Sequence, residues 1–272
     1  MIIQDFMKNA LDEDIGRGDL FSQIFPPEAA SAKVIAKSEG IVCGELYINE
    51  LASLEEFDVE WVLKDGDHFK YGDVIMRLRG DSHTLLAIER VLLNTLHHAS
   101  SIATYTNKFV KIIEGYNVKL LDTRKTRPLL RHLEKYATRT GGAVNHRMGL
   151  DDALMLKDTH LKTIDNLSLF MQEARKKIPF MAKIEVECET LESAQEAMHA
   201  GADIVMCDNM TPAQLKEVVS YRNKFCTHIM LEASGNITLD TIEIYAQSGV
   251  DAISSGSLIH QSRWIDLSMK MD

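Results

Sequence analysis

The sequence predicts an α/β protein in which an N-terminal α+β domain precedes a barrel of parallel strands. Three features lead to this prediction. Short apolar runs recur through the second half, amphipathic helical patterns lie between them, and the first part of the chain follows a different order of elements.

Six short apolar runs in the second half have the composition of buried strands, at residues 118–121, 153–156, 182–186, 203–207, 228–231 and 250–253. The later runs follow one another at roughly 20–25 residues, which suits a strand, a crossover helix and the next parallel strand. Thr211, Pro212 and Gln214 mark one helix start, with a capping hydroxyl, an early proline and a glutamine three residues on. The sequence therefore predicts successive βα units.

Two of these units resemble each other weakly. Residues 200–209 (AGADIVMCDN) and 248–257 (SGVDAISSGS) both place a Gly-x-Asp motif before an apolar run and polar residues after it. Such repetition is typical of a βα barrel, which in its complete form has eight strands. Six clear strands leave open whether the barrel closes.

The first part of the chain predicts mixed elements rather than βα units. We expect an N-terminal helix, a strand near 32–38, a helix near 44–56, strands near 57–63 and 73–79, and a long helix from Ser82 to Glu114. The predicted domains are therefore residues 1–112 and residues 113–272.

The charge of the chain is uneven. Its net charge of −10 disfavours general binding to nucleic acids or anionic membranes. Residues 119–162 nevertheless hold ten Lys or Arg against five Asp or Glu. A charge run is usually a solvated helix face, but a cationic segment in an acidic protein also indicates a focused site for an anion.

The N-terminus and the cysteines favour a cytoplasmic protein. No apolar run approaches the ~20 residues that span a bilayer, and the acidic, amphipathic start is unlike a signal peptide. The four cysteines, Cys43, Cys188, Cys207 and Cys226, show no C-x-x-C spacing. We interpret them as buried free thiols rather than metal ligands.

Polar side chains follow each apolar run, where an α/β barrel carries its working groups. With the loop before the second run, they are Asp122, Thr123, Arg124, Lys125, Asn145, His146, Arg147, Lys157, Asp158, Glu187, Asp208, Asn209, Glu232, Ser234, Gly235, Asn236, Ser254, Ser255, Gly256 and Ser257.

The cations of this set suit a polycarboxylate ligand. Arg124, Lys125, Arg147 and Lys157 can surround such an anion, and the planar guanidinium of arginine pairs with a carboxylate through two hydrogen bonds.

The remaining groups suit a metal ion and phosphates. Glu187 and Asp208, on neighbouring strand ends, can hold Mg²⁺. The Ser-Gly loops at 234–236 and 255–257, each expected to open a helix, can cradle a phosphate with backbone N–H groups. A salt-bridge network and ordinary turns would explain each feature alone, but their joint occurrence at successive strand ends favours a site.

Eight motifs then suggest a family: ERVLLNTL (89–96), DTRKT (122–126), LEKYATRTGGAVNHR (133–147), LKDTH (156–160), EVE (185–187), CDNM (207–210), LEASGNI (231–237) and SSGSLIH (254–260). On these motifs, and in their order, the chain resembles the quinolinate phosphoribosyltransferases. The resemblance implies an N-terminal α/β sandwich domain followed by an open TIM-like barrel. It also implies the conversion of quinolinate and phosphoribosyl pyrophosphate to nicotinate mononucleotide, pyrophosphate and CO₂ in NAD biosynthesis, with Mg²⁺.

The resemblance also assigns roles to residues. Those implied to bind quinolinate are Arg90, Thr123, Arg124, His146, Arg147 and Lys157. Those implied to bind phosphoribosyl pyrophosphate are Lys125, Glu187, Asp208, Ser234, Gly235, Asn236, Ser255, Gly256 and Ser257. Lys125, Lys157, Glu187 and Asp208 are the implied catalytic residues, with Glu187 and Asp208 on the metal. Arg90 matches an arginine that reaches the site of a neighbouring subunit, which implies a homodimer or larger homo-oligomer.

Four positions depart from the family pattern as the resemblance presents it. Arg127 and Leu129 stand where threonine and glycine are usual, Ala143 replaces a glycine, and Thr159 replaces an asparagine. These departures concern loop geometry, since none removes a cation or carboxylate from the predicted site.

Other functions are compatible with some of these features. Lys157 at a strand end would also suit a Schiff-base aldolase or decarboxylase. Within the same fold, a nicotinate phosphoribosyltransferase or a paralogue of altered specificity, such as the relatives associated with molybdenum transport, would share most of the motifs. A non-catalytic interaction module has only the acidic composition in its favour.

Overall fold

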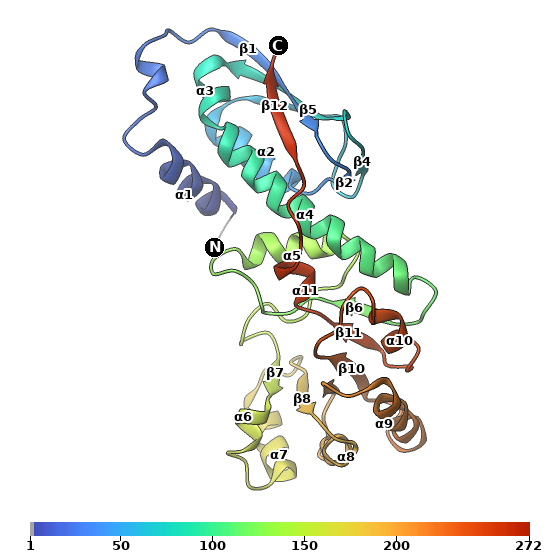
Figure 1. The fold of residues 1–272 in the computed structure, drawn as a ribbon. Helices are drawn as coiled ribbons and strands as arrows, with labels where there is room; N and C mark the ends of the chain where they lie inside the picture. Colours follow the sequence, from blue (N-terminus) through green and yellow to red (C-terminus); the bar gives the residue numbers. More distant parts are fainter. Residues whose placement is uncertain (1–2) are drawn as a thin grey trace. The chain divides into compact units, whose positions relative to one another are not determined.

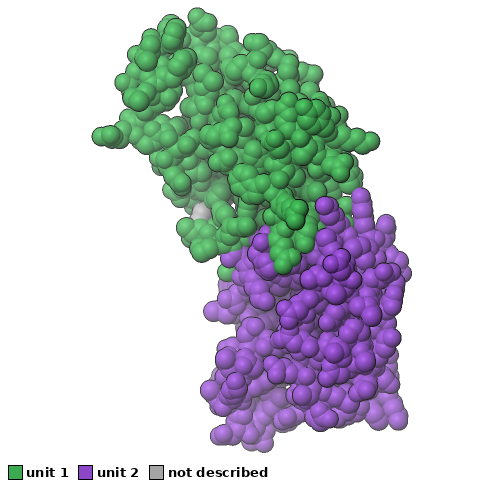
Figure 2. Space-filling model, viewed as in Figure 1, with its two compact units in different colours: residues 1–107, 127–142, 261–272 green, residues 108–126, 143–260 purple. Residues whose placement is uncertain are grey.

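The computed structural model describes residues 3–272, and the chain divides into two compact units (Figure 2). Unit 1 comprises residues 1–107, 127–142 and 261–272, and unit 2 comprises residues 108–126 and 143–260. The units interleave along the chain, whereas the sequence-based division has a single boundary after residue 112. Residues 127–142 and 261–272 therefore pack with unit 1 although the sequence placed them in the second domain.

Unit 1 is built on an antiparallel sheet with the strand order β12-β1-β5-β3. Its strands are β1 (Ala29–Ala36), β3 (Asp58–Trp61), β5 (Val74–Asp81) and β12 (Leu267–Met271), and β2 (Gly40–Ile41) pairs with β4 (His68–Phe69). Its helices include α1 (Ile3–Ile15), α2 (Glu45–Glu55), α3 (Ser82–Ala87) and α5 (Arg131–Thr140) (Figure 1). The 3₁₀ turn η1 spans Phe21–Gln23.

The long helix expected from Ser82 to Glu114 is interrupted. It forms α3 and then α4 (Glu89–Ile113), with Ile88 between them. The Asp81 carboxylate caps α3 by accepting hydrogen bonds from the backbone N–H groups of His83 and Thr84. The start expected at Ser82 is therefore correct, because a capping carboxylate satisfies amides that would otherwise lack partners.

Two long-range contacts tie the late segments into unit 1. Asp65 Oδ1 accepts from the backbone N–H groups of Gly44 and Glu45 at 2.9 and 3.0 Å, which caps α2, and its Oδ2 accepts from the Tyr136 hydroxyl of α5. The strand β12, which the sequence analysis did not include, pairs antiparallel with β1. Its only local signal is the alternation of buried and more exposed side chains that begins at Leu267.

Unit 2 contains a six-stranded, wholly parallel sheet in the order β6-β11-β10-β9-β8-β7. The strands are β6 (Lys119–Leu121), β7 (Leu154–Leu156), β8 (Ile184–Cys188), β9 (Ile204–Asp208), β10 (Met230–Ser234) and β11 (Ala252–Ser254). The helices between them are α6 (Asp158–Leu161), α7 (Leu167–Lys177), α8 (Leu191–His199), α9 (Pro212–Phe225), α10 (Ile242–Ala246) and α11 (Ser257–His260) (Figure 1).

The sheet is a barrel that stays open at one seam. The consecutive strands β6 and β7 lie at opposite ends of the order, and among the described residues no ladder joins them. Val144, in the loop between α5 and β7, forms a single parallel bridge with Leu121 of β6. The open, TIM-like barrel predicted from the sequence is thus confirmed.

The observed strands begin one or two residues later than the apolar runs, and those from β8 onward also end one to three residues later. Glu187, Asp208 and Ser234 therefore belong to strands, because the backbone ladder continues through them, for example in the pairing of Ser234 with Asp208. The loop at 234–236 does not open a helix as expected, since residues 237–241 separate it from α10.

The internal repeat has a structural role at the amino ends of the strands. Asp203 Oδ2 accepts a backbone N–H of β8 at 2.7 Å and the Arg175 guanidinium at 2.6 Å. Asp251 Oδ2 does the same one repeat later, with a backbone N–H of β10 and with Arg222, both at 2.7 Å. The repeated Gly-x-Asp motif thus ties each strand to its neighbour and to a covering helix.

Within residues 3–272, no helix is both long and apolar enough to cross a membrane.

Candidate active site

The carboxyl ends of β7, β8 and β9 bring a lysine and two acids together in unit 2. Lys157 follows β7, and its ammonium donates to Glu187 Oε2 at 3.0 Å. Glu187 pairs with Met206 in the register, and Asp208 lies two residues beyond Met206 on the same face of β9. The predicted carboxylate pair therefore faces one space.

The electrostatics of Asp208 reflect this crowding. Burial raises the pKa of its carboxyl, the neighbouring Glu187 raises it further, and Lys157 and Lys125 oppose the rise. Because such interactions need proximity, the four residues implied to be catalytic lie within one electrostatic cluster. We refer to Lys125, Lys157, Glu187 and Asp208 as the charge cluster.

The loop after β10 is shaped by close backbone approach. Gly235 has a φ of 96°, and a Cβ added there would lie 2.2 Å from Asn209 Oδ1. Asn236 also adopts a left-handed conformation, and its side-chain amide donates to Asn209 Oδ1 at 3.1 Å. Only glycine fits at position 235, so the loops after β9 and β10 interlock and present backbone groups beside Asp208.

The second Ser-Gly loop turns its hydroxyls inward. Ser255 Oγ donates to the carbonyl of Ile237 at 3.0 Å and lies 2.6 Å from Ser257 Oγ, and both serines are buried. A Cβ added at Gly256 would lie 3.0 Å from the side chain of Lys125. The backbone of this loop is therefore available to a ligand, and the absence of a side chain at Gly256 leaves room for Lys125. The two serine hydroxyls are already used in hydrogen bonds within the protein.

The two predicted arginines lie close enough to influence each other. Burial lowers the pKa of the Arg147 guanidinium, and the positive charge of Arg124 lowers it further. Arg147 donates to the carbonyl of Ala153 at 3.0 Å, whereas the buried Nε of Arg124 has no hydrogen-bond partner. Two neighbouring guanidinium groups with unused donors form a site that an anion would stabilise.

Thr123 contributes to the shape of the same loop. Its Oγ1 accepts a hydrogen bond from the backbone N–H of Lys125 at 3.0 Å. This contact fixes the turn between Arg124 and Lys125.

His146 points into the barrel rather than toward an open space. Its Nε2 lies 3.2 Å from Glu185 Oε2 and 3.3 Å from Glu232 Oε2, and both acids are buried. Its Nδ1 accepts the backbone N–H of Arg147 at 2.8 Å. Both ring nitrogens are therefore engaged within unit 2, and direct binding of a ligand through the ring has no free atom to use.

Of the acids Glu185 and Glu232, only Glu232 was noted from the sequence, as a polar residue after an apolar run, and neither was given a role. Each is a charged residue inside an apolar strand, and this is the signal for a partner, because a buried carboxylate needs one. Their partner, His146, is far away along the chain.

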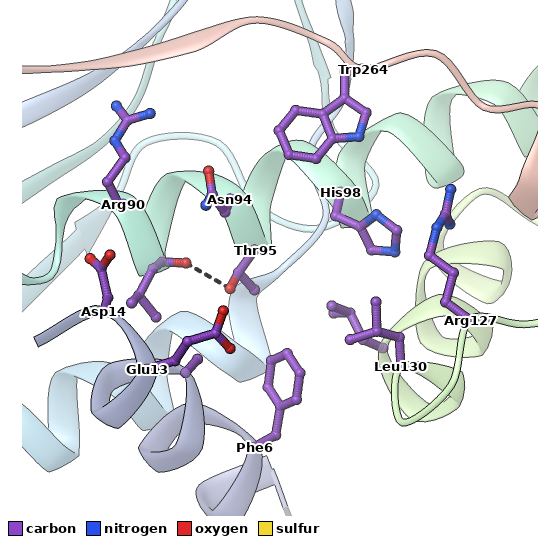
Figure 3. Close-up of a pocket in the computed structure, with 13 residues that line it drawn as sticks. Phe6, Glu13, Asp14, Arg90, Asn94, Thr95, His98, Arg127, Leu130 and Trp264 are labelled. Carbon is purple, nitrogen blue, oxygen red and sulfur yellow. Dashed lines mark hydrogen bonds between the residues drawn. The ribbon is translucent and has the colours of Figure 1, made fainter. Parts of the chain in front are cut away.

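Arg90 belongs to unit 1, where it lies at a cavity of ≈ 430 Å³ whose lining residues are all in unit 1. The lining side chains come from α1, α4, α5 with the loop before it, and the segment with Trp264, and Figure 3 shows most of them. The Arg90 guanidinium pairs with Glu89 at 2.8 Å and is 56% exposed. Arg90 therefore retains donors for a further partner.

The departure at Arg127 has a structural explanation. Its NH1 donates to Glu134 Oε1 at 2.7 Å, and His98 Nε2 lies 2.9 Å from the same oxygen. Burial alone would raise the pKa of Glu134, but the hydrogen bonds from His98 and Arg127 hold it below its usual value. Arg127 thus helps to compensate a fully buried carboxylate.

The other departures fit their places. Leu129 has a φ of 65°, a left-handed conformation that explains why glycine would suit this position. Ala143 is buried, and Thr159 lies in the first turn of α6.

Comparison with known proteins covers almost the whole chain. Residues 19–100 match the N-terminal domain of quinolinate phosphoribosyl transferase, and residues 102–270 match its C-terminal domain. A protein of Bacillus subtilis (strain 168), named as a probable carboxylating nicotinate-nucleotide pyrophosphorylase, is 43% identical over 94% of this chain and 89% of its own length.

Solved structures of similar fold lead to the same family. The nicotinate-nucleotide pyrophosphorylase of Francisella tularensis superposes with a TM-score of 0.93 at 35% identity, covering 99% of this chain and 96% of its own. Human nicotinic acid phosphoribosyltransferase, with a TM-score of 0.62 at 13% identity over 100% of this chain and 74% of its own, shares the fold alone.

Proposed function

Because the chain belongs to the quinolinate phosphoribosyl transferase family, we propose that it transfers the phosphoribosyl group of phosphoribosyl pyrophosphate to quinolinate. The products are nicotinate mononucleotide, pyrophosphate and CO₂, in a step of NAD biosynthesis. The observation that carries this proposal is the charge cluster, in which two lysines and two acids meet at the carboxyl ends of parallel strands.

Quinolinate is a dianion, so its site needs several cations in a partly desolvated space. Arg124 and Arg147 supply neighbouring guanidinium groups, and the unpaired Nε of Arg124 is a donor that awaits an acceptor. Each charged hydrogen bond contributes about 1.5–3 kcal/mol net, so two or three of them account for specific binding. Lys157 completes this set from the adjacent strand end.

Glu187 and Asp208 are the residues that would hold Mg²⁺. Their carboxylates share one face, and the raised pKa of Asp208 reflects burial and repulsion by Glu187, which a divalent cation would relieve. Mg²⁺ held by these two carboxylates would supply positive charge that neutralises the departing pyrophosphate. The loop around Gly235 and the loop around Gly256 supply the backbone groups for the phosphates of the same substrate.

The chain's own residues act mainly by position and charge. Lys125 and Lys157 stabilise the negative charge that develops as pyrophosphate leaves and the ribose acquires oxocarbenium character. The quinolinate nitrogen then bonds to the ribose carbon. When CO₂ departs, its electron pair stays on the ring carbon, where the adjacent positively charged nitrogen stabilises it until a proton from solvent is added. No covalent intermediate on the enzyme is needed.

The Schiff-base alternative has less support. The Lys157 ammonium is paired with Glu187 at 3.0 Å, and an ammonium held in this way has no lone pair with which to attack a carbonyl. Trapping of a carbonyl substrate on Lys157 with borohydride would reverse this preference.

We propose further that the enzyme is a homodimer or larger homo-oligomer in which Arg90 completes the site of a neighbouring subunit. The exposed guanidinium beside a cavity of ≈ 430 Å³ supports this proposal (Figure 3). Mixed oligomers of Arg90→Ala and Lys157→Ala chains should regain part of the activity, because one composite site per pair is then intact. No recovery, with subunit exchange confirmed, would contradict a shared site.

A cytoplasmic location is also proposed. The four cysteines are buried and unpaired, which suits a reducing compartment.

The deciding experiment is the release of labelled CO₂ from quinolinate labelled in the 2-carboxyl group. We expect release only when phosphoribosyl pyrophosphate and Mg²⁺ are both present, and its loss after chelation by EDTA. Nicotinate in place of quinolinate is the matched control, and product formation from nicotinate alone would instead indicate a nicotinate phosphoribosyltransferase.

A further inference from the structure

Three buried polar side chains meet inside the barrel of unit 2, below the loop that carries Arg147. His146 Nε2 contacts Glu185 of β8 and Glu232 of β10, whose side chains are each 2% exposed. The second carboxylate oxygens of both acids are buried without a hydrogen-bond partner. Burying two carboxylates is costly, so their contact with His146 calls for an explanation beyond packing.

The hydrogen bonds define the state of the imidazole. The backbone N–H of Arg147 points at Nδ1, which must therefore offer a lone pair and carry no proton. Burial alone would lower the pKa of His146, and hydrogen bonds with Glu185 and Glu232 raise it to about 10. The amide hydrogen of Arg147 nevertheless leaves no room for a second proton on Nδ1, so the geometry supports the neutral ring, with its proton on Nε2 between the two acids.

This tautomer also argues against a metal ion in the cluster. The nearest atoms of His146, Glu185 and Glu232 lie within 4.8 Å of one another, a separation that would suit a shared ion. A histidine that binds metal through Nε2 usually donates from Nδ1, whereas here Nδ1 accepts and Nε2 holds the proton. The proton on Nε2 takes the place that an ion would occupy.

The same loop is clamped from a second side. Asp122, fully buried after β6, accepts the backbone N–H of His146 at 2.8 Å and the side-chain amide of Asn145 at 2.6 Å. Asp122 thus fixes the backbone, while Glu185 and Glu232 fix the imidazole ring. Arg147 is the next residue, and its own N–H is held by that ring.

We infer that Glu185 and Glu232 are positioning residues for quinolinate binding, which act through His146 to hold the backbone of Arg147 at the rim of the site. This inference rests on the proposed function. In this role His146 connects the two buried acids to the backbone of a substrate-binding arginine. The acids themselves touch no substrate.

Glu232→Leu tests the inference, because an apolar residue of similar size in place of a buried carboxylate is often tolerated. We expect KM for quinolinate to rise about tenfold, while KM for phosphoribosyl pyrophosphate changes by less than about twofold. Glu232→Gln keeps an acceptor oxygen for Nε2 and should bring KM for quinolinate back to within about threefold of the wild type.

Asp251→Ala serves as the matched control, since it removes a carboxylate of unit 2 far from the loop in sequence and should lower the melting temperature without changing either KM. An unchanged KM for quinolinate in Glu232→Leu would overturn the inference. If that variant fails to fold, Glu185→Leu removes the other acceptor and is expected to show the same tenfold rise. Failure of both to fold would also overturn it, because the acids would then be needed for the fold itself.

The wild-type enzyme separates this inference from the proposed function. If the wild type releases no CO₂ from quinolinate, the proposed function fails before any variant is compared. If the wild type is active and the Leu variant keeps its KM for quinolinate, the positioning role alone fails.

Discussion

The two ends of the parallel sheet in unit 2 use charged residues in opposite ways. At the amino ends, Asp203 and Asp251 each accept hydrogen bonds from a backbone N–H and from an arginine. Their negative charges are therefore compensated within the protein. At the carboxyl ends, Asp208 is repelled by Glu187 and Arg124 has an unpaired donor. Charges that the fold has not neutralised are those that remain free to act on a ligand.

This difference separates stability from function within one sheet. In α/β barrels the amino ends of strands serve the fold and the carboxyl ends carry the chemistry. The internal repeat of Gly-x-Asp motifs belongs to the first class, although in the sequence it sits only a few residues from the charge cluster. Substitutions at the two ends should therefore have opposite effects on activity and on stability.

The largest effect is expected from Arg147→Ala at the carboxyl ends. Loss of two charged hydrogen bonds costs about 3 kcal/mol, which corresponds to an increase of about 100-fold in KM for quinolinate. KM for phosphoribosyl pyrophosphate should change little, as initial rates at varied concentrations of each substrate will reveal. Equal increases in the two constants would break the assignment of Arg147 to quinolinate.

Asp251→Ala at the amino ends should cost about 2 kcal/mol of unfolding free energy. The change leaves Arg222, whose side chain is 10% exposed, without its partner. Urea denaturation measures the loss, and the specific activity of the folded fraction should stay unchanged. A fall in kcat at full folding would mean that the two ends are not independent.

Asp203→Ala is the graded counterpart and should cost only about 1 kcal/mol. Its partner Arg175 is 39% exposed, so water compensates the orphaned guanidinium more fully. The same urea titration ranks the two variants. A larger loss for Asp203→Ala than for Asp251→Ala would contradict burial as the cause.

The smallest expected effect is a gain, rather than a loss, of unfolding free energy, and it concerns Asp208. Burial, and then Glu187, raise the pKa of Asp208 from its ordinary value of 3.8. The folded state therefore holds this proton more tightly than the unfolded state, so stability falls as pH rises from 3.8 through the raised pKa, and the ionised carboxyl destabilises the fold at pH 7. Because the side chain is partly exposed, Asp208→Asn should gain less than about 1 kcal/mol at pH 7.

That gain should vanish as pH falls below 3.8, where Asp208 is protonated in both states, and activity with Mg²⁺ should be lost at every pH. Urea denaturation at two pH values, with Asp251→Asn as the control that loses stability, measures the contrast. A stability loss in Asp208→Asn at pH 7 would place Asp208 with the structural carboxylates instead.

Much of unit 2 could be predicted because its signals are local. Six apolar runs with helical patterns between them specify parallel strands, and the observed strands differ from the runs by only a few residues. The members of the charge cluster were all found, since the side chains that follow parallel strands must emerge at one edge. The acids Glu185 and Glu232 received no role, because only the contact with His146 explains them.

Unit 1 was predicted less completely for a related reason. The strand β12 pairs with β1, which is more than 200 residues earlier, and α5 joins unit 1 through the contact between Tyr136 and Asp65. Such contacts depend on shape complementarity between distant segments and leave little trace in local periodicity. The boundary expected after residue 112 could not anticipate them.

The sequence by itself determined the kinds of side chain that stand at the strand ends and the order of the elements that present them, because both follow from short-range patterns. Only the tertiary structure decided which of those side chains face outward with spare hydrogen-bonding capacity and which are turned inward and neutralised. His146 shows the distinction. Its ring is held by two acids that lie about 40 and 85 residues further along the chain. Burying those acids without a partner would cost more free energy than any local conformational preference of the residues around His146 could supply.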